Sequence, residues 1–119
     1  MRLFSKIFSG VFTILFVWAA LVQYNDPDAF MWYIIYGIAA VASFLFFLGK
    51  LNLLIPVVLA FAYLIGAWIF WPDHFEGVSI GGGNIDNIEH ARESLGLLIN
   101  ALVMLFYAWR VKVVRALNI

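Results

Sequence analysis

The chain has 119 residues and no net charge, and 66% of the residues are hydrophobic while only 12% are charged. Soluble domains are nearer one half apolar and one quarter charged, so this composition excludes an ordinary soluble protein. The absence of cysteine removes disulfides, thiolate metal sites and thiol nucleophiles from consideration. We therefore expect an all-α integral membrane protein, with the lipid bilayer as its surroundings and no nucleic-acid partner.

Four apolar runs are each long enough to cross a hydrocarbon core of roughly 30 Å as a helix. The first run follows the basic segment MRLFSK, for which a secretory signal peptide is the alternative. Its length and the three later runs favour a retained helix. We predict a single membrane domain over residues 1–119, a four-helix bundle with up-down topology. The expected elements are helices at about 3–24, 27–48, 51–71 and 87–117, and an outer loop at 73–86.

The first polar interruption is the sequence QYNDPD at residues 23–28. Pro27 is favourable at the first position of a helix, and Asp26 before it can cap free backbone N–H groups. Asp28 then falls in the first turn, where the helix dipole favours an anion. These residues predict that the second helix begins near Pro27.

Small residues and turn residues organise the middle of the chain. Ala39 with Ser43, and Ala62 with Gly66, are four residues apart and predict close contacts between helices. The segment LGKLN, residues 48–52, predicts a tight turn between the second and third helices. Pro56 follows early in the third helix, where it is expected to bend the helix.

The predicted outer loop contains three consecutive glycines at positions 81–83. Such a run is not expected to hold a fixed conformation unless a partner orders it. A phosphate-binding loop is the alternative, but the stretch lacks the lysine and the preceding strand of a P-loop. Asp86 followed by Glu89 has the spacing of a capping box, which predicts that the last helix begins near Asn87.

The charges separate between the two ends of the predicted helices. Six of the seven basic residues fall on the side of the chain termini: Arg2, Lys6, Lys50, Arg110, Lys112 and Arg115. The seven acidic residues all fall on the opposite side: Asp26, Asp28, Asp73, Glu76, Asp86, Glu89 and Glu93. The positive-inside rule places both termini in the cytoplasm, at the inner membrane if the source is bacterial. Arg92 is the one basic residue on the acidic side.

Polar residues of the last helix form a stripe that defines the candidate site. Its members lie within an arc of about 100° at 100° per residue. We expect the stripe to face the bundle, because an amide near the bilayer centre should contact protein and not lipid. The stripe consists of Glu89, Arg92, Glu93, Gly96 and Asn100. Its expected neighbours lie in residues 23–28, between the first and second helices, which we call the 1–2 turn: Gln23, Asn25, Asp26 and Asp28.

Arg92 is the expected centre of this cluster, because a planar guanidinium can serve two carboxylates at once. Two interpretations stay open. In the first, Arg92 ties Asp26 or Asp28 to Glu89 and Glu93 and only holds the fold together. In the second, the same cluster also binds a cation, a lipid headgroup or the basic segment of a partner protein.

A metal site is a weaker hypothesis for the same region. Its oxygen and imidazole ligands would come from Asp26, Asp28, Glu89, His90 and Glu93. However, His90 directly follows Glu89 and does not match the Glu-x-x-His spacing of di-iron bundles. His74 and His90 lie at the loop edge and outside the apolar spans, which argues against haem ligation. No serine elbow, cysteine nucleophile or zincin spacing is present. We predict no cofactor and no catalytic residue.

Two motifs carry a family resemblance. With QYNDPD, followed by Trp32 and Tyr36, and with EHARESLGLLI over residues 89–99, the chain resembles the transmembrane protein 220 family of small four-helix membrane proteins. The pattern of that family is an N-D-P-D turn after the first span and an acidic, arginine-containing start to the last. The resemblance covers most of the chain and implies four spans, but it brings no biochemical activity with it.

Three functions follow from these observations. We expect a non-catalytic membrane subunit or scaffold, whose acidic outer side docks a membrane-protein partner or a second copy of the chain. The alternative is a small carrier or binding protein for a cation or a lipid headgroup. A membrane enzyme is the third hypothesis.

Overall fold

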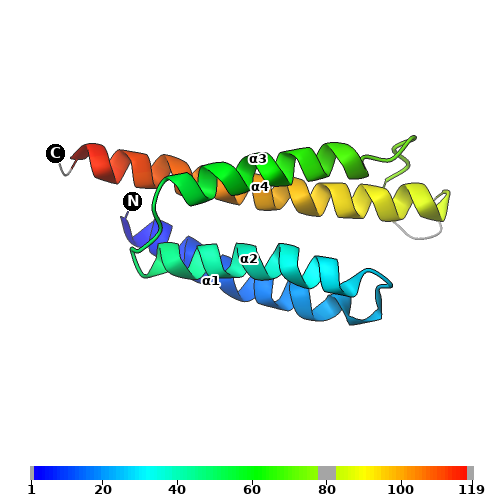
Figure 1. Ribbon diagram of the computed structural model, residues 1–119, viewed down its shortest axis with the longest axis horizontal. Helices are drawn as coiled ribbons and strands as arrows, with labels where there is room; N and C mark the ends of the chain where they lie inside the picture. The colour runs from blue at the N-terminus through cyan, green and yellow to red at the C-terminus, as the bar shows by residue number, and fades with distance from the viewer. Residues whose placement is uncertain (1, 78–82, 118–119) are drawn as a thin grey trace. The chain divides into compact units, whose positions relative to one another are not determined.

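The computed structural model describes residues 2–77 and 83–117, and these residues are helical with short connections (Figure 1). The elements are α1 (Arg2–Leu21), the short 3-10 helix η1 (Val22–Asn25), α2 (Ala29–Phe47), α3 (Leu54–Phe70) and α4 (Ile85–Leu117). The described residues contain no β-strand. The prediction of an all-α protein is confirmed.

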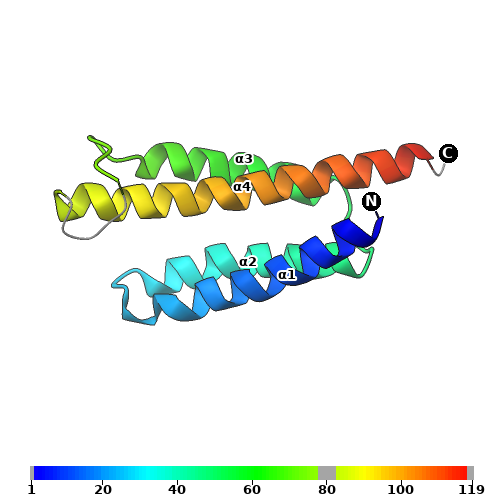
Figure 2. The same cartoon turned by 180° about the vertical axis from the view of Figure 1, so that it is seen from behind.

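The helices belong to two units. The first unit contains α1, η1, α2 and the end of α4 from Arg110, and the second contains α3 from Pro56 together with α4 as far as Trp109. Within the first unit, α1 and α2 lie side by side as a helical hairpin (Figures 1 and 2). Within the second unit, α3 and the first part of α4 form the equivalent pair, seen from both sides in the same figures.

The contact between α1 and α2 depends on a glycine and on aromatic rings. A Cβ atom added at Gly10 would lie 3.4 Å from the ring of Phe47, so the α1 backbone and this ring are in van der Waals contact. Further along the pair, the rings of Phe16 and Tyr36 have their centroids 6.5 Å apart. The absence of a side chain at Gly10 of α1 thus makes room for the ring of Phe47 on α2.

The contact between α3 and α4 combines close packing with a buried hydrogen bond. The hydroxyl of Ser94 donates to the carbonyl oxygen of Ala67 over 2.7 Å. A Cβ atom added at Gly66 would lie 3.2 Å from Cδ1 of Leu97, which shows how closely the helices approach. Gly66 therefore has the predicted role, whereas its expected companion Ala62 is exposed.

The turn between α2 and α3 follows from two residues. Gly49 has a φ of 75°, and the N–H groups of Gly49 and Lys50 donate to the carbonyls of Phe46 and Leu45 over 2.9 and 2.8 Å. This pair of bonds is a Schellman motif, which ends a helix with a residue in the left-handed region. The side-chain oxygen of Asn52 then accepts from the N–H of Ile55 over 3.2 Å and caps the start of α3.

Pro56 lies in the first turn of α3, where a proline is not expected to bend the helix. It is the third residue of α3, which begins at Leu54. The first four N–H groups of a helix have no partner within the helix, so the missing N–H of proline costs no hydrogen bond there. At this position Pro56 gives α3 no reason to bend.

Three of the helices are long and apolar enough to cross a membrane: residues 3–25 in α1 and η1, α2, and residues 85–114 of α4. The fourth, α3, is equally apolar but has only 17 residues, or about 26 Å at 1.5 Å per residue. The longest helix is α4, with 33 residues and a length of about 50 Å. It exceeds the hydrocarbon thickness of roughly 30 Å, so part of it extends beyond the apolar core of a bilayer.

Candidate functional site

The first part of the predicted site, residues 23–28, folds as the 3-10 helix η1 and a tight turn. The side-chain amide of Gln23 donates to the carbonyl of Ala19 over 3.0 Å. The carboxylate of Asp26 accepts from the N–H of Asp28 over 2.7 Å, and the carbonyl of Asp26 accepts from the N–H of Ala29 over 3.0 Å. Gln23 and Asp26 therefore make hydrogen bonds to their own stretch of backbone.

This turn places the start of α2 later than the sequence suggested. The helix begins at Ala29, and Asp28 occupies the N-cap position without a side-chain capping bond. The predicted start was near Pro27, with Asp26 as the cap. Asp26 instead closes an Asx-turn around Pro27, a conformation that aspartate favours because its short side chain reaches the backbone two residues on. Asn25 and Asp28 remain exposed to solvent.

The start of α4 also differs from the capping box that the sequence suggested. The helix begins at Ile85, and the side-chain oxygen of Asn84 accepts from the N–H of Asp86 over 2.9 Å. The N–H of Ile88 donates to the carbonyl of Asn84 over 3.1 Å. Asn84 is therefore the capping residue, and Asp86 lies in the first turn, where its negative charge is favourable near the N-terminal end of the helix dipole.

The predicted polar stripe on α4 spans a range of burial. Glu89 and Arg92 are exposed, Glu93 is half-buried, and Asn100 is completely buried. Nδ1 of His90 lies 3.6 Å from Oε1 of Glu93, a contact that becomes an ion pair when the imidazole is protonated. The ring of His90 also stacks against Phe70 at the end of α3, with 6.4 Å between the ring centroids.

These positions determine which predicted residues come together. Glu89, His90, Arg92 and Glu93 share the first three turns of α4 in the second unit, whereas Asp26 and Asp28 belong to the first unit. The pairing of Arg92 with the 1–2 turn stays a prediction. Among residues 2–77 and 83–117, no three histidine, aspartate or glutamate side chains are grouped so that they could hold a metal ion.

Glu76 has a role that the sequence did not reveal. Oε2 of Glu76 accepts from the N–H of Asn84 over 2.8 Å and from the side-chain amide of Asn87 over 3.2 Å. A Cβ atom added at Gly83 would lie 2.8 Å from the same oxygen, so only glycine fits there without a shift of Glu76. Glu76 thus joins the segment after α3 to the start of α4. The run of glycines was the signal in the sequence that another group approaches the backbone closely here. Of its three residues, 81 and 82 lie outside the described part of the chain.

Ser94 is the second residue that was missed. It is fully buried on α4 and bonds to Ala67 as described above. The available signal was its position three residues after Ala91 and three before Leu97, both of which are also buried. Residues three and four apart share one face of a helix, so a serine in that series is expected to need a partner on the adjacent helix.

Helices of this length and apolarity define an integral membrane protein of the all-α class. A comparison with protein-family models matches residues 15–109 to the family described as "Transmembrane family 220, helix". The chain belongs to this family, as its two motifs indicated. Searches of the curated proteins and of the solved structures found no match.

Proposed function

We propose that this protein is a non-catalytic membrane subunit or scaffold that docks a partner protein through its acidic outer side. The arrangement has four membrane-spanning helices with both termini in the cytoplasm. The 1–2 turn and the segment between α3 and α4 then lie on the other side of the membrane. The partner carries a basic segment next to its own membrane span.

The lengths of the helices support four spans. Three helices satisfy the length and hydropathy of a span, and the 17 residues of α3 reach the lower end of the usual range of about 17 to 25 residues. Apolar residues extend α3 at both ends, with Leu51 before it and Trp71 after it. A short span of this kind is accommodated by local thinning of the bilayer, at a small cost per ångström of mismatch.

The distribution of charge supports the orientation. With four spans, the connection that carries Lys50 lies on the same side as the basic residues of the two termini, and the seven acidic residues lie on the opposite side. Lysine and arginine are retained preferentially on the cytoplasmic side.

One observation supports docking most directly, namely an exposed pair of stacked aromatic rings among carboxylates. The rings of Trp71 and Phe75 have their centroids 5.5 Å apart and planes 14° apart, and the two residues are 48% and 52% exposed. Asp73 lies between them in the sequence, and the bonds of Glu76 to Asn84 and Asn87 bring this segment against the start of α4. We call the set Trp71, Asp73, Phe75, Asp86 and Glu89 the outer patch.

The chemistry of the outer patch suits a basic partner. Aromatic side chains dominate the binding energy of many protein interfaces, and an arginine or lysine also gains from contact with an aromatic face. The exposed carboxylates of the outer patch raise the association rate with a cationic segment and select against acidic ones.

Photo-crosslinking in the native membrane tests this function. A photoreactive phenylalanine analogue replaces Phe75 in one variant and Leu48 in the control; these residues are 52% and 46% exposed and lie in different turns. We expect one dominant partner adduct from position 75 and none from position 48. The adduct should carry a basic juxtamembrane segment and should weaken at least fivefold when Asp73→Asn and Asp86→Asn are combined. An adduct that is equally strong without these acids, or a protein that forms none, would contradict the proposal.

One observation favours ligand binding as a second candidate. Asn100 is fully buried in α4, and neither its side-chain oxygen nor its nitrogen has a hydrogen-bond partner among the described residues. A buried amide without a partner costs about 1 to 3 kcal/mol, which a bound polar ligand would recover. Replacement by leucine separates the two cases. If no ligand binds there, Asn100→Leu raises the stability of the purified protein; if a ligand is bound, it removes that ligand from the native mass spectrum.

A further inference from the structure

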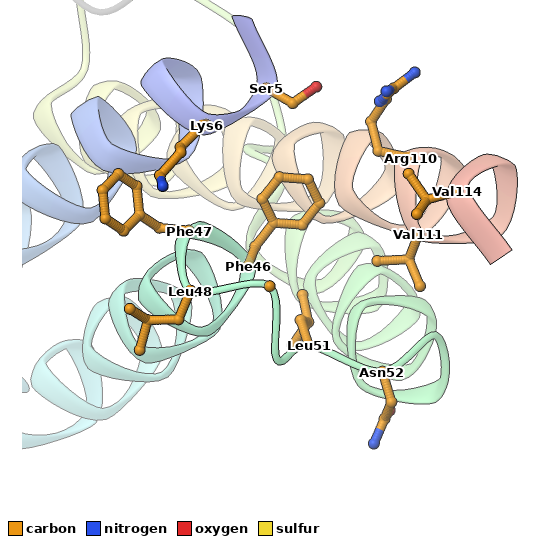
Figure 3. A pocket seen from close by; sticks show the side chains of 11 residues that line it. Ser5, Lys6, Phe46, Phe47, Leu48, Leu51, Asn52, Arg110, Val111 and Val114 are labelled. Carbon is orange, nitrogen blue, oxygen red and sulfur yellow. The ribbon is translucent and has the colours of Figure 1, made fainter. Parts of the chain in front are cut away.

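A cavity of about 680 Å³ lies in the first unit, where α1 begins, α2 ends and the last turns of α4 pass (Figure 3). Its volume falls within the range of about 300 to 1,000 Å³ that is typical of small-molecule sites. The lining residues are Ser5 and Lys6 of α1, Phe46 and Phe47 of α2, Leu48, Gly49, Leu51 and Asn52 of the connection, and Arg110, Val111 and Val114 of α4. None of the predicted site residues takes part.

The charges of this lining have one sign. Lys6 and Arg110 are cations, Ser5 and Asn52 add polar groups, and no acidic residue is among the eleven that line the cavity. Arg110 is only 9% exposed. The lining therefore carries two positive charges and no negative one, which favours an anionic ligand over a cationic one.

Apart from Gly49, the other residues that line the cavity have apolar side chains, namely Phe46, Phe47, Leu48, Leu51, Val111 and Val114. The ring of Phe46 lies between Lys6 and Arg110, and Ser5 points toward the side of Arg110 (Figure 3). The ammonium of Lys6 lies 5.0 Å from the centre of the Phe47 ring, a cation–π distance that holds it at this wall. Leu48 lines the cavity and is itself 46% exposed, so the apolar wall continues onto the outer surface of α2.

A cavity lined by cations and by an apolar wall is complementary to an anionic lipid, which has a charged headgroup and apolar acyl chains. We infer that the cavity binds an anionic phospholipid, whose phosphate group contacts Arg110 while the exposed Lys6 adds a second positive charge across the Phe46 ring, with an acyl chain along Phe47 and Leu48. Arginine is suited to phosphate because its planar N–H groups form two parallel charge-assisted hydrogen bonds, and lysine adds a second charge. Cations near the ends of membrane helices reach the level of the lipid headgroups, which is where a phosphate of the leaflet lies. The inference is independent of the outer patch, because the two share no residue.

Native mass spectrometry of the purified protein tests this inference, with phosphatidylglycerol and phosphatidylcholine of identical acyl chains as probes. We expect the protein to retain phosphatidylglycerol about tenfold more strongly, because the headgroup of phosphatidylcholine carries a cation that offsets its phosphate. Equal retention of the two lipids would overturn the inference.

Matched variants locate the site. Arg110→Gln and Lys6→Gln should each lower the retention of phosphatidylglycerol about tenfold, because each removes one of the two positive charges that favour the anionic headgroup. Lys112→Gln makes the same change of charge on an exposed residue of α4 that does not line the cavity, and it should leave retention within twofold. Lys6 is exposed, so its variant remains informative if Arg110→Gln fails to fold. An effect of Lys112→Gln as large as that of Lys6→Gln would overturn the assignment to this cavity.

Inorganic phosphate distinguishes a lipid from a soluble anion. We expect it to neither displace phosphatidylglycerol nor raise the melting temperature of the lipid-free protein at millimolar concentration, because it lacks the acyl chain that the apolar wall contacts. Displacement of the lipid by phosphate alone would show that the cavity takes a free phosphate and would overturn the lipid assignment.

Discussion

Replacement of Ser94 by alanine removes the buried hydrogen bond between α3 and α4. The bond is short, 2.7 Å from Oγ to the carbonyl oxygen of Ala67, and Ser94 is fully buried. Side-chain hydrogen bonds between membrane helices average about 0.6 kcal/mol and reach about 1.7 kcal/mol. The variant leaves the carbonyl of Ala67 with one donor fewer. We therefore expect the free energy of unfolding to fall by about 1 kcal/mol, which changes the unfolding equilibrium constant about fivefold.

The chain offers a matched control for this change. Ser9 is equally buried, but its hydroxyl donates to the carbonyl of Lys6 within the same helix over 3.0 Å. Ser9→Ala therefore removes a hydrogen bond within α1 and not one between helices, and we expect it to change the stability by less than about 0.5 kcal/mol. The assay is reversible unfolding of both variants by SDS in mixed micelles, followed by circular dichroism. Equal stabilities of Ser94→Ala and Ser9→Ala would refute the reasoning.

Three further predictions concern the loop, the outer cluster and the packing of α1. Glu76→Ala removes two hydrogen bonds from the start of α4, so amide hydrogens near Asn84 should exchange at least fivefold faster while those of α1 do not change. Arg92→Ala should lower the melting temperature by a few degrees at most and Lys112→Ala by less than about one degree, because only Arg92 has carboxylates expected around it and an exposed ion pair contributes about 0 to 1 kcal/mol; equal melting temperatures would exclude the predicted cluster. Gly10→Leu should destabilise the protein by about 1 to 3 kcal/mol in the same SDS assay, whereas Gly37→Leu, which meets nothing within 4 Å of an added Cβ, should have little effect.

Local features were predictable from the sequence because neighbouring residues determine them. The end of α2 at Gly49 requires a left-handed residue, and the start of α3 at Asn52 requires a capping side chain; both are properties of single residue types. The start of α4 was displaced for a non-local reason. Asn84 and Asp86 are both residue types that cap helices, and the structure has Asn84 as the cap. The N–H of Asn84 also donates to Glu76, eight residues earlier, a contact that the local sequence does not reveal.

Burial was harder to predict, because a membrane protein is apolar on its lipid-facing and its protein-facing surfaces alike. Small residues at spacing four predicted contact for both Ala62 and Gly66, but only Gly66 packs against α4, while Ala62 is exposed. On α4 the angular spacing correctly places Glu89 and Arg92 on one side, yet it contains no information on depth, and both are exposed. How deeply a side chain of α4 is buried depends on which residues of α3 lie opposite it. A helical wheel of α4 alone does not contain that information.

Cysteine accessibility tests most directly the central claim, that four spans separate an acidic outer side from a basic cytoplasmic side. The chain contains no cysteine, so single replacements Asp28→Cys, Asp86→Cys and Lys50→Cys each report one position without background. A maleimide that does not cross membranes is added to intact cells and then to permeabilised cells. We expect positions 28 and 86 to react in intact cells and position 50 to react only after permeabilisation. Reaction of position 86 on the opposite side from position 28, or of position 50 in intact cells, would contradict this claim.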